Sequence, residues 1–518
     1  MREAGDSLVL TLNIGTFACE AAVFDMNANM LMRVEESLTI RSSKPNYYEQ
    51  EPRNWIDTII DITRSISKRI DLNKNKIEAI VLTGHTQSLL LTDATLSPLT
   101  SCILWLDQRA IKEFEALRKD AMVTEELYKL TGIKYDVTIP LCKLLWIRRS
   151  RPKALSKFKR IYFSPKDYIA EFFTGRYVID YPTASTTGFL NIHSGKWESY
   201  ALDIAALDAS DMPKLVKAHE VVGTLKSDVA EILGLKSGIP VIIGKCNVLA
   251  YALGAGVISS SQVADSTVAS EIVSIPTDKP VLDPLQRIDC IIHAVPSKWL
   301  VVGAMMSSGI VLRWLMKNLL SVGNSREISL IDELASKSPP GARGLIVLPH
   351  FMGERTPYWN PKARGVIVGM TLGHSKEDLV RAFIESIGFG VKNIIEVFDE
   401  LGLKPDDVRV IGPFAALRIL REVKADILGI KISMPRYVDA ACVGAYILGL
   451  VGTNYYNNIE AALNDVVKIN EIVLPDLRKN SIYSKLYEIY KSTYYNLIEI
   501  FDNLYSATLA WTQYEGFA

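Results

Sequence analysis

The sequence of 518 residues has few cysteines, no net charge and no long apolar run. Its six cysteines are scattered, with no CxxC pair and no histidine at ligand spacing, which argues against a disulfide framework and a zinc site. Lysine plus arginine and aspartate plus glutamate both number 58, so no overall field attracts nucleic acid or an anionic membrane. The first residues lack a signal-peptide layout, and the longest apolar run, residues 248–258, is about half a membrane crossing. We therefore expect a cytoplasmic protein that binds a small ligand and has no nucleic-acid or membrane partner.

What the sequence does contain is the pattern of an α/β protein. Residues 8–14, 21–24 and 30–38 read as consecutive strands joined by turns, residues 52–70 as a helix with one apolar face, and residues 77–83 as another strand. Alternation of this kind predicts helices that cover a central sheet. The length predicts more than one domain.

The pattern starts again in the second half of the chain. Residues 262–275 read as strands around a polar turn, and the later segments read as helices at 375–401, 417–428 and 440–450 with a strand at 408–412. Both halves thus open with strands bent around a short polar turn, which indicates a weak internal duplication. We place the domains at residues 1–256 and 257–518. A last helix over residues 481–509 carries tyrosines at helical spacing and is expected to dock by that face.

A series of short motifs runs through the whole chain. In order they are Leu12-Asn13-Ile14-Gly15-Thr16-Phe17, Glu49-Gln50-Glu51-Pro52 with Trp55, Gly84-His85-Thr86-Gln87, Trp105-Leu106-Asp107-Gln108-Arg109, Thr174-Gly175 through Asp180-Tyr181, and Gly353-Glu354-Arg355-Thr356-Pro357. Their order and spacing resemble those of the FGGY carbohydrate kinases, the family of glycerol, xylulose and ribulose kinases. The resemblance extends from about residue 8 to about residue 505.

This resemblance implies a fold and a different ligand for each domain. The fold is α/β, with two actin-like, ribonuclease-H-like domains (the sugar kinase, HSP70 and actin fold) flanking a central cleft. A sugar or polyol is expected on the first domain, and ATP with Mg²⁺ mainly on the second. The substrate-binding positions implied are His85, Gln87, Asp107 and Arg109. His85 could instead be a packed core histidine, and Asp107 with Arg109 could be a structural ion pair.

The position of the family's general base departs from the family pattern. Gly244-Lys245-Cys246-Asn247, in register with Leu253-Gly254-Ala255-Gly256, places Asn247 where the resemblance implies an aspartate. An amide cannot take a proton from a hydroxyl at neutral pH, and loss of a general base costs about 10²- to 10⁴-fold in rate. The alternative explanations for Asn247 are a misaligned register, with the base elsewhere, and an engineered replacement of aspartate by asparagine. Lys245 could offer charge to a phosphate or be a solvated surface lysine, and Glu354 and Arg355 are expected to be structural.

The phosphate and nucleotide segments depart from the pattern as well. In the first turn, Asn13, Gly15, Thr16 and Phe17 carry a neutral amide where the family has aspartate and an aromatic ring where it has a second threonine. The second turn has Thr267 and then Val268 in place of a glycine that allows close approach of phosphate. The adenosine loop reads Gly412, Pro413, Phe414, with a proline that has no N–H and a bulky ring. These changes put ATP and Mg²⁺ in doubt, although the family implies both.

Three hypotheses follow. The first is a non-catalytic sugar-kinase homologue that binds a sugar or polyol, paired with an active kinase paralogue or with itself as a dimer. The second is a working ATP-dependent kinase with a non-standard nucleotide site, in which Asp107 or Asp265 supplies the missing carboxylate. The third is a structural component of a larger assembly.

Overall fold

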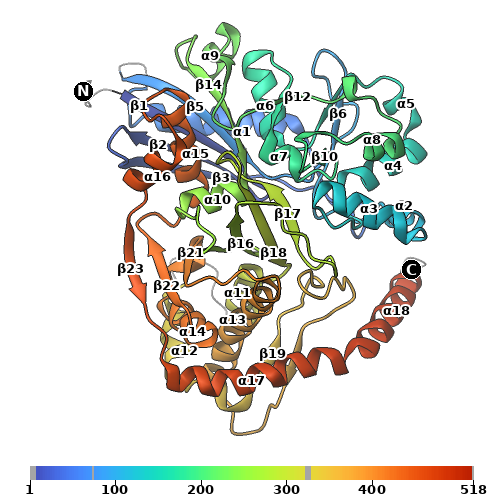
Figure 1. Cartoon of the computed structure of the whole chain (residues 1–518), viewed down its shortest axis with the longest axis vertical. Helices are drawn as coiled ribbons and strands as arrows, with labels where there is room; N and C mark the ends of the chain where they lie inside the picture. The colour runs from blue at the N-terminus through green and yellow to red at the C-terminus, as the bar shows by residue number, and fades with distance from the viewer. Residues whose placement is uncertain (1–6, 73–74, 321–327, 516–518) are drawn as a thin grey trace.

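Two mixed β-sheets form the cores of the two halves of the molecule (Figure 1). The structure is a computed structural model and describes residues 7–72, 75–320 and 328–515. The first sheet lies in the upper part of Figure 1 and the second sheet below it. This is the two-domain α/β fold that the sequence predicted, with helices packed against each sheet.

The first sheet is built from the beginning of the chain. Its strands lie in the order β13 (Val221–Thr224), β14 (Pro240–Cys246), β5 (Lys76–Gly84), β1 (Ser7–Ile14), β2 (Ala18–Asp25) and β3 (Met30–Ser37). Strands β1, β2 and β3 form an antiparallel meander, whereas β5 pairs parallel to β1 and β14 parallel to β5. Helices α1 (Pro52–Ser67) and α6 (Pro165–Thr174) cover one face. The strands and the helix predicted from residues 8–83 are thereby confirmed.

The second sheet repeats this arrangement. Its order is β17 (Asp289–Ile292), β18 (Trp299–Met305), β16 (Glu271–Thr277), β15 (Gln262–Thr267), β21 (Asp407–Ile411), β22 (Lys431–Pro435) and β23 (Ile469–Val473). Again antiparallel pairs come first, β15 with β16 and β16 with β18, while β21 pairs parallel to β15 and β22 parallel to β21. The turns between the first two strands of each sheet, residues 15–17 and 268–270, therefore hold equivalent places. The polar residues Asp265, Ser266 and Thr267, at which the sequence predicted the second turn, instead end strand β15.

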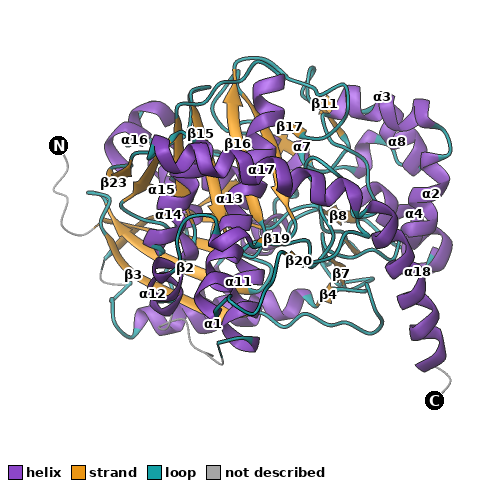
Figure 2. Ribbon diagram, turned by 90° about the horizontal axis from the view of Figure 1, so that it is seen from below, coloured by secondary structure: helices purple, strands orange, loops and turns teal. Residues whose placement is uncertain are grey.

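Helices of the second half pack in layers against its sheet. They are α11 (Gly309–Asn318), α12 (Ser329–Lys337), α13 (Lys376–Glu400) and α14 (Arg418–Leu428). The C-terminal segment forms two helices, α17 (Leu477–Asn496) and α18 (Ile498–Glu515), where the sequence predicted one, because the chain leaves helical geometry at Leu497. Four tyrosines of α17 are buried, as predicted: Tyr483, Tyr487, Tyr490 and Tyr494. Seen from below, α17 crosses the second half and α18 projects from it toward the C-terminus (Figure 2).

Two helices join the halves at close range. Helix α10 (Asn247–Gly254) packs against α15 (Ala440–Gly452), and α15 lies on the first sheet although it comes late in the chain. Glycines allow this approach: a Cβ on Gly254 would lie 2.0 Å from the Ala440 carbonyl oxygen, and one on Gly444 would lie 2.3 Å from the Ala250 carbonyl oxygen. Helix α16 (Ile459–Val466) follows α15 and joins the same apolar cluster.

Smaller elements extend the first half beyond its sheet. Their bounds are β4 (Glu49–Gln50), β6 (Leu90–Thr92), β7 (Cys102–Ile103), α2 (Ile111–Arg118), α3 (Ala121–Thr131), α4 (Pro140–Ser150), α5 (Pro152–Leu155), β8 (Arg160–Tyr162), β9 (Val178–Asp180), α7 (Tyr181–Ser185), β10 (Leu190–Asn191), β11 (Lys196–Trp197), α8 (Ser199–Ala205), β12 (Lys214–Val216) and α9 (Ser227–Leu233), with β19 (Ile346–Leu348) and β20 (Val366–Val368) in the second half. All six cysteines are buried and unbridged. None of the helices in the described part of the chain combines the length and apolar character of a membrane span.

Candidate functional site

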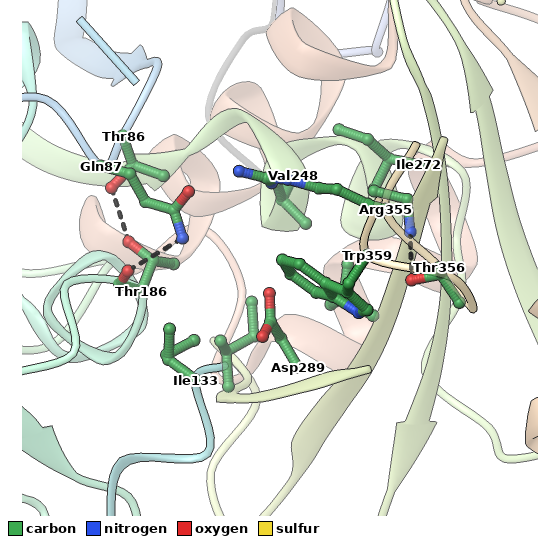
Figure 3. A pocket seen from close by; sticks show the side chains of 13 residues that line it. Thr86, Gln87, Ile133, Thr186, Val248, Ile272, Asp289, Arg355, Thr356 and Trp359 are labelled. Atoms are coloured by element: carbon green, nitrogen blue, oxygen red, sulfur yellow. Dashed lines mark hydrogen bonds between the residues drawn. The ribbon is translucent and has the colours of Figure 1, made fainter. Parts of the chain in front are cut away.

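A cavity lies between the two halves (Figure 3). It is partly open to solvent and has a volume of about 80 Å³. The lining residues are Thr86, Gln87, Ile133, Thr186, Val248, Ile272, Asp289, Ile291, Val302, Ala304, Arg355, Thr356 and Trp359. Both halves contribute polar side chains to an otherwise apolar lining, which is the pattern of a ligand site.

The polar wall of the first half follows the end of β5. Gln87 donates its side-chain amide to the Thr186 carbonyl oxygen at 3.2 Å, and the hydroxyls of Thr86 and Thr186 are 2.6 Å apart. Gln87 has a φ of 62°, a left-handed conformation that is uncommon outside glycine. This conformation and the Thr186 contact fix the Gln87 side chain along the wall on the left of Figure 3. Of the four substrate positions predicted from the sequence, Gln87 is the one that lines the cavity.

The wall of the second half carries opposite charges. The Arg355 guanidinium donates to the Thr138 hydroxyl at 3.0 Å and lies 3.5 Å from the Asp136 carboxylate, so it bridges to the first half. Asp289 accepts a hydrogen bond from the Lys134 main-chain N–H at 2.9 Å. Burial raises the pKa of Asp289 to about 6, so this carboxyl can change charge near neutral pH. The sequence assigned Arg355 only a structural role and did not single out Asp289.

Three predicted substrate positions lie outside the cavity lining. His85 is 5% exposed, with its Nδ1 3.0 Å from the Ser88 hydroxyl. Arg109 makes a bidentate ion pair with Asp107, binds Glu49, and lies over the rings of Tyr47 and Trp146. The side chains of Asp107 and Arg109 are 0% and 1% exposed. The structure thus places them in the interior of the first half, in the arrangement of a structural ion pair.

Asn247 begins α10 beside the cavity, next to Val248. Its Oδ1 accepts a hydrogen bond from the Thr83 hydroxyl at 3.1 Å. The neighbouring Lys245 is fully buried rather than solvated, and its ammonium binds the Leu249 carbonyl oxygen. Burial lowers the pKa of Lys245 well below its usual value. Position 247, at the start of helix α10, therefore carries an amide in place of a carboxylate.

The first turn is held by internal partners. The Thr16 hydroxyl accepts a hydrogen bond from the Trp105 indole at 2.8 Å, and the Thr16 main-chain carbonyl oxygen accepts one from the Gln50 side-chain amide. Asn13 is 4% exposed, donates to Glu20 at 3.3 Å, and has an Oδ1 without a partner among the described residues. Gly15 allows the tight turn, since a Cβ there would lie 2.7 Å from the Ala18 carbonyl oxygen. The turn keeps its backbone shape without presenting a carboxylate.

Phe17 and Glu20 complete the surroundings of this turn. The Phe17 side chain is 51% exposed and so presents an apolar ring to solvent. Glu20 pairs with Arg33 at 3.3 Å, and Arg33 also lies 3.4 Å from Asp439. Mg²⁺ takes oxygen ligands, chiefly carboxylates and phosphates. With Asn13 neutral and Glu20 already paired to an arginine, the residues at this turn do not fit a magnesium site.

The second turn is occupied by a buried lysine. Lys424, from α14, lies 2.5 Å from Asp265, 2.6 Å from Glu271 and 3.0 Å from the Thr267 hydroxyl. Burial and the nearby Glu271 raise the pKa of Asp265 well above its usual range, against the opposing effect of Lys424. Burial also opposes ionisation of Glu271, but the ammonium and its hydrogen bonds outweigh this, so the pKa of Glu271 is lowered. The opposite directions of the two shifts indicate that a proton shared by these carboxyl groups is favoured on Asp265 rather than on Glu271.

The adenosine loop lies directly against the second turn. Gly412 has a φ of 92°, and a Cβ there would lie 2.5 Å from the Thr267 carbonyl oxygen. Phe414 is 1% exposed, and a Cβ on Gly309 would lie 2.7 Å from its ring. Pro413 begins the turn and offers no N–H. The structure therefore brings these two segments together, with the Phe414 ring filling the space at the start of α11.

Comparison with known proteins follows the same division into halves. The N-terminal domain profile of the FGGY family of carbohydrate kinases matches residues 8–254, and the C-terminal domain profile matches residues 270–453. The chain is 28% identical over 511 residues to a gluconokinase of Bacillus subtilis, covering 96% of this chain and 97% of that protein. It is 27% identical over 488 residues to a xylulose kinase of Staphylococcus epidermidis, covering 94% and 96%.

Solved structures confirm the fold. The structure of a ligand-bound xylulose kinase from Lactobacillus acidophilus superposes with a TM-score of 0.89 at 24% identity, covering 96% of this chain and all of that chain. A gluconate kinase from the same organism gives 0.87 at 24% identity, covering 95% and 98%. At such identities the likeness concerns the fold alone.

Proposed function

Because the chain belongs to the FGGY family of carbohydrate kinases, we propose that it binds a sugar or polyol in the cavity between its halves and that phosphoryl transfer to this ligand is impaired. In this proposal the chain is a binding or regulatory subunit, paired with an active kinase paralogue or with a second copy of itself. The carrying observation is that the cavity keeps polar groups on both walls, whereas Asn247 beside it carries no carboxylate.

Impaired transfer is supported by the partners of the phosphate turns. Kinases of the family use ATP and typically Mg²⁺. In this chain the Thr16 hydroxyl is bonded to Trp105 and the Thr267 hydroxyl to Glu271 and Lys424. Phosphoryl transfer depends on positioned donors, metal and a residue that orients the nucleophile, and each of these is weakened here.

A second candidate function is a working kinase with a non-standard site. The two carboxylates that the sequence offered for it, Asp107 and Asp265, are paired with Arg109 and Lys424 and lie outside the cavity lining. Asp289, however, lines the cavity with a pKa of about 6, in the range of a general base. Asp289 could thus replace the missing general base, so phosphoryl transfer to a sugar should be tested directly.

Ligand binding by the whole chain tests the proposal. We expect D-xylulose or D-gluconate, at millimolar concentration, to raise the melting temperature, because a ligand that binds only the folded state stabilises it. Mg·ATP at several millimolar is expected to give neither a shift in melting temperature nor heat in calorimetry. Submillimolar binding of Mg·ATP, together with phosphorylated product detected by mass spectrometry, would establish the second candidate instead.

Replacing Gln87 with asparagine is expected to weaken sugar binding about tenfold, the equivalent of one hydrogen bond. Asparagine tolerates the left-handed backbone, so the wall keeps its shape while the amide withdraws from the cavity. The measurement is calorimetric titration with whichever of D-xylulose or D-gluconate binds the wild type. As a control, Asp107→Asn alters a buried predicted position that does not line the cavity and should change stability more than affinity.

A further inference from the structure

Lys143 is a fully buried lysine on helix α4, behind the cavity wall. Its ammonium donates hydrogen bonds to two main-chain carbonyl oxygens, those of Gln87 and Thr138, each at 2.5 Å. A buried ammonium costs free energy unless it is well hydrogen-bonded, so its retention here needs a structural or functional reason. The two carbonyls belong to two different segments that line or hold the cavity.

The first carbonyl belongs to a strained segment. Gln87 has a left-handed φ of 62°, and its side chain lines the cavity. Backbone of this kind persists only where surrounding contacts hold it. The Lys143 ammonium binds this residue's own carbonyl, and the Ser88 N–H binds the Phe163 carbonyl oxygen at 3.2 Å.

The second carbonyl belongs to the segment between α3 and α4 that reaches the other half. Thr138 accepts a hydrogen bond from Arg355 of the second half at 3.0 Å, and its hydroxyl donates to Asp136 at 2.6 Å. The same segment carries Ile133, a lining residue, and Lys134, whose N–H binds Asp289. Lys143 thus binds Gln87 of the cavity wall directly and is linked to Arg355 through Thr138.

We propose that Lys143 is a positioning residue. It fixes Gln87 of the cavity wall relative to the segment of residues 133–139 that Arg355 binds, and so sets the affinity for a sugar or polyol. The ligand named in this inference rests on the proposed function. The effect of Lys143 on the Gln87 and Thr138 segments does not depend on it. The hydrogen bonds of the Lys143 ammonium go to the main-chain carbonyl oxygens of Gln87 and Thr138, so it acts on the ligand through these two residues.

The charge of Lys143 gives the proposal a pH signature. Burial lowers the pKa of Lys143 to about 7, against the opposing carboxylates of Asp107 and Asp136 and the thiols of Cys102 and Cys142. His85, which also faces it, stays neutral because burial lowers its pKa to about 3. As the pH rises through about 7, the ammonium becomes an amine that donates weaker hydrogen bonds. Ligand affinity is therefore expected to fall over this range.

The test compares Lys143→Met with Lys143→Arg and with Tyr490→Leu in the full-length protein. Tyr490 is fully buried in α17, does not line the cavity, and serves as a destabilised control. Calorimetry with D-xylulose and D-gluconate from about pH 6 to about pH 8.5 should show at least a tenfold loss of affinity in Lys143→Met. Lys143→Arg should keep part of the affinity and lose the pH dependence, because a guanidinium stays charged. Tyr490→Leu should bind as the wild type does.

A measurement without ligand separates this inference from the proposed function. Hydrogen–deuterium exchange of peptides covering residues 84–88 and 133–139 should rise in Lys143→Met and remain unchanged in Tyr490→Leu. If exchange in both segments is unaltered, the positioning role is overturned whatever the ligand result. If exchange rises but neither sugar binds even the wild type, the positioning role stands and the proposed ligand class fails. Wild-type affinity in Lys143→Met would also overturn the inference.

Discussion

Replacing Lys424 with methionine is expected to lower the free energy of unfolding by about 3–5 kcal/mol, because it strands buried acidic groups without their cation. The side chains of Lys424, Asp265 and Glu271 are at most 1% exposed, and the two Nζ–carboxylate distances are 2.5 and 2.6 Å. Methionine preserves most of the volume, so the change isolates charge from packing. Urea unfolding at neutral pH, read by circular dichroism, measures the loss.

The two acidic partners are expected to respond differently. Because the pKa of Asp265 is raised and that of Glu271 lowered, the negative charge beside Lys424 is favoured on Glu271. Lys424→Met with Glu271→Gln should therefore recover more stability than Lys424→Met with Asp265→Asn. The exposed pair of Lys337 and Glu333 is the control, and Lys337→Met should leave unfolding unchanged within error. Equal losses in the buried and the exposed variants would contradict the assignment.

Acidification from pH 6.5 to about pH 4 is expected to cost about 3 kcal/mol of stability for each of His85 and His293. Burial lowers the pKa of both from 6.5 to about 3, with nearby lysines adding to the effect. Between these values the unfolded chain binds the protons and the folded chain does not. The contribution is thus complete above pH 6.5 and is lost as the pH falls toward 3.

The geometry of both rings accounts for this. Each Nδ1 has a partner, the Ser88 hydroxyl for His85 and the Val295 N–H for His293, whereas neither Nε2 has one among the described residues. Asparagine keeps an acceptor near Nδ1 and cannot titrate. Urea unfolding at a series of pH values should therefore give a shallower acid limb for His85→Asn and His293→Asn. Acid limbs parallel to that of the wild type would show that these histidines already bind protons in the fold.

The fold was predictable because its causes are local. Alternation and apolar runs within β1, β5 and β15 are decided by each residue's neighbours in sequence, and the helical face of α1 is equally local. The first turn was found because its tight backbone needs a residue such as Gly15. The division of α17 from α18 at Leu497 was missed, because the apolar face continues past Tyr494 with Leu497 and Phe501 and no glycine or proline marks a helix end.

The site was only partly predictable, because motifs identify segments and not the direction of their side chains. The Gly84–Gln87 motif reached the cavity, but Gln87 faces it while His85 faces the interior. Asp107 and Arg109 matched a family motif and form an internal ion pair.

The sequence by itself determined the two repeated sheets, the turns between their first strands and the absence of an aspartate at position 247. Only the tertiary structure decided which polar side chains meet: Lys424 with Asp265, 159 residues apart, and Arg355 with Thr138, 217 residues apart. Backbone conformation follows from neighbours along the chain. The partner and the pKa of a buried charge follow from desolvation and from groups that only folding brings within a few ångströms.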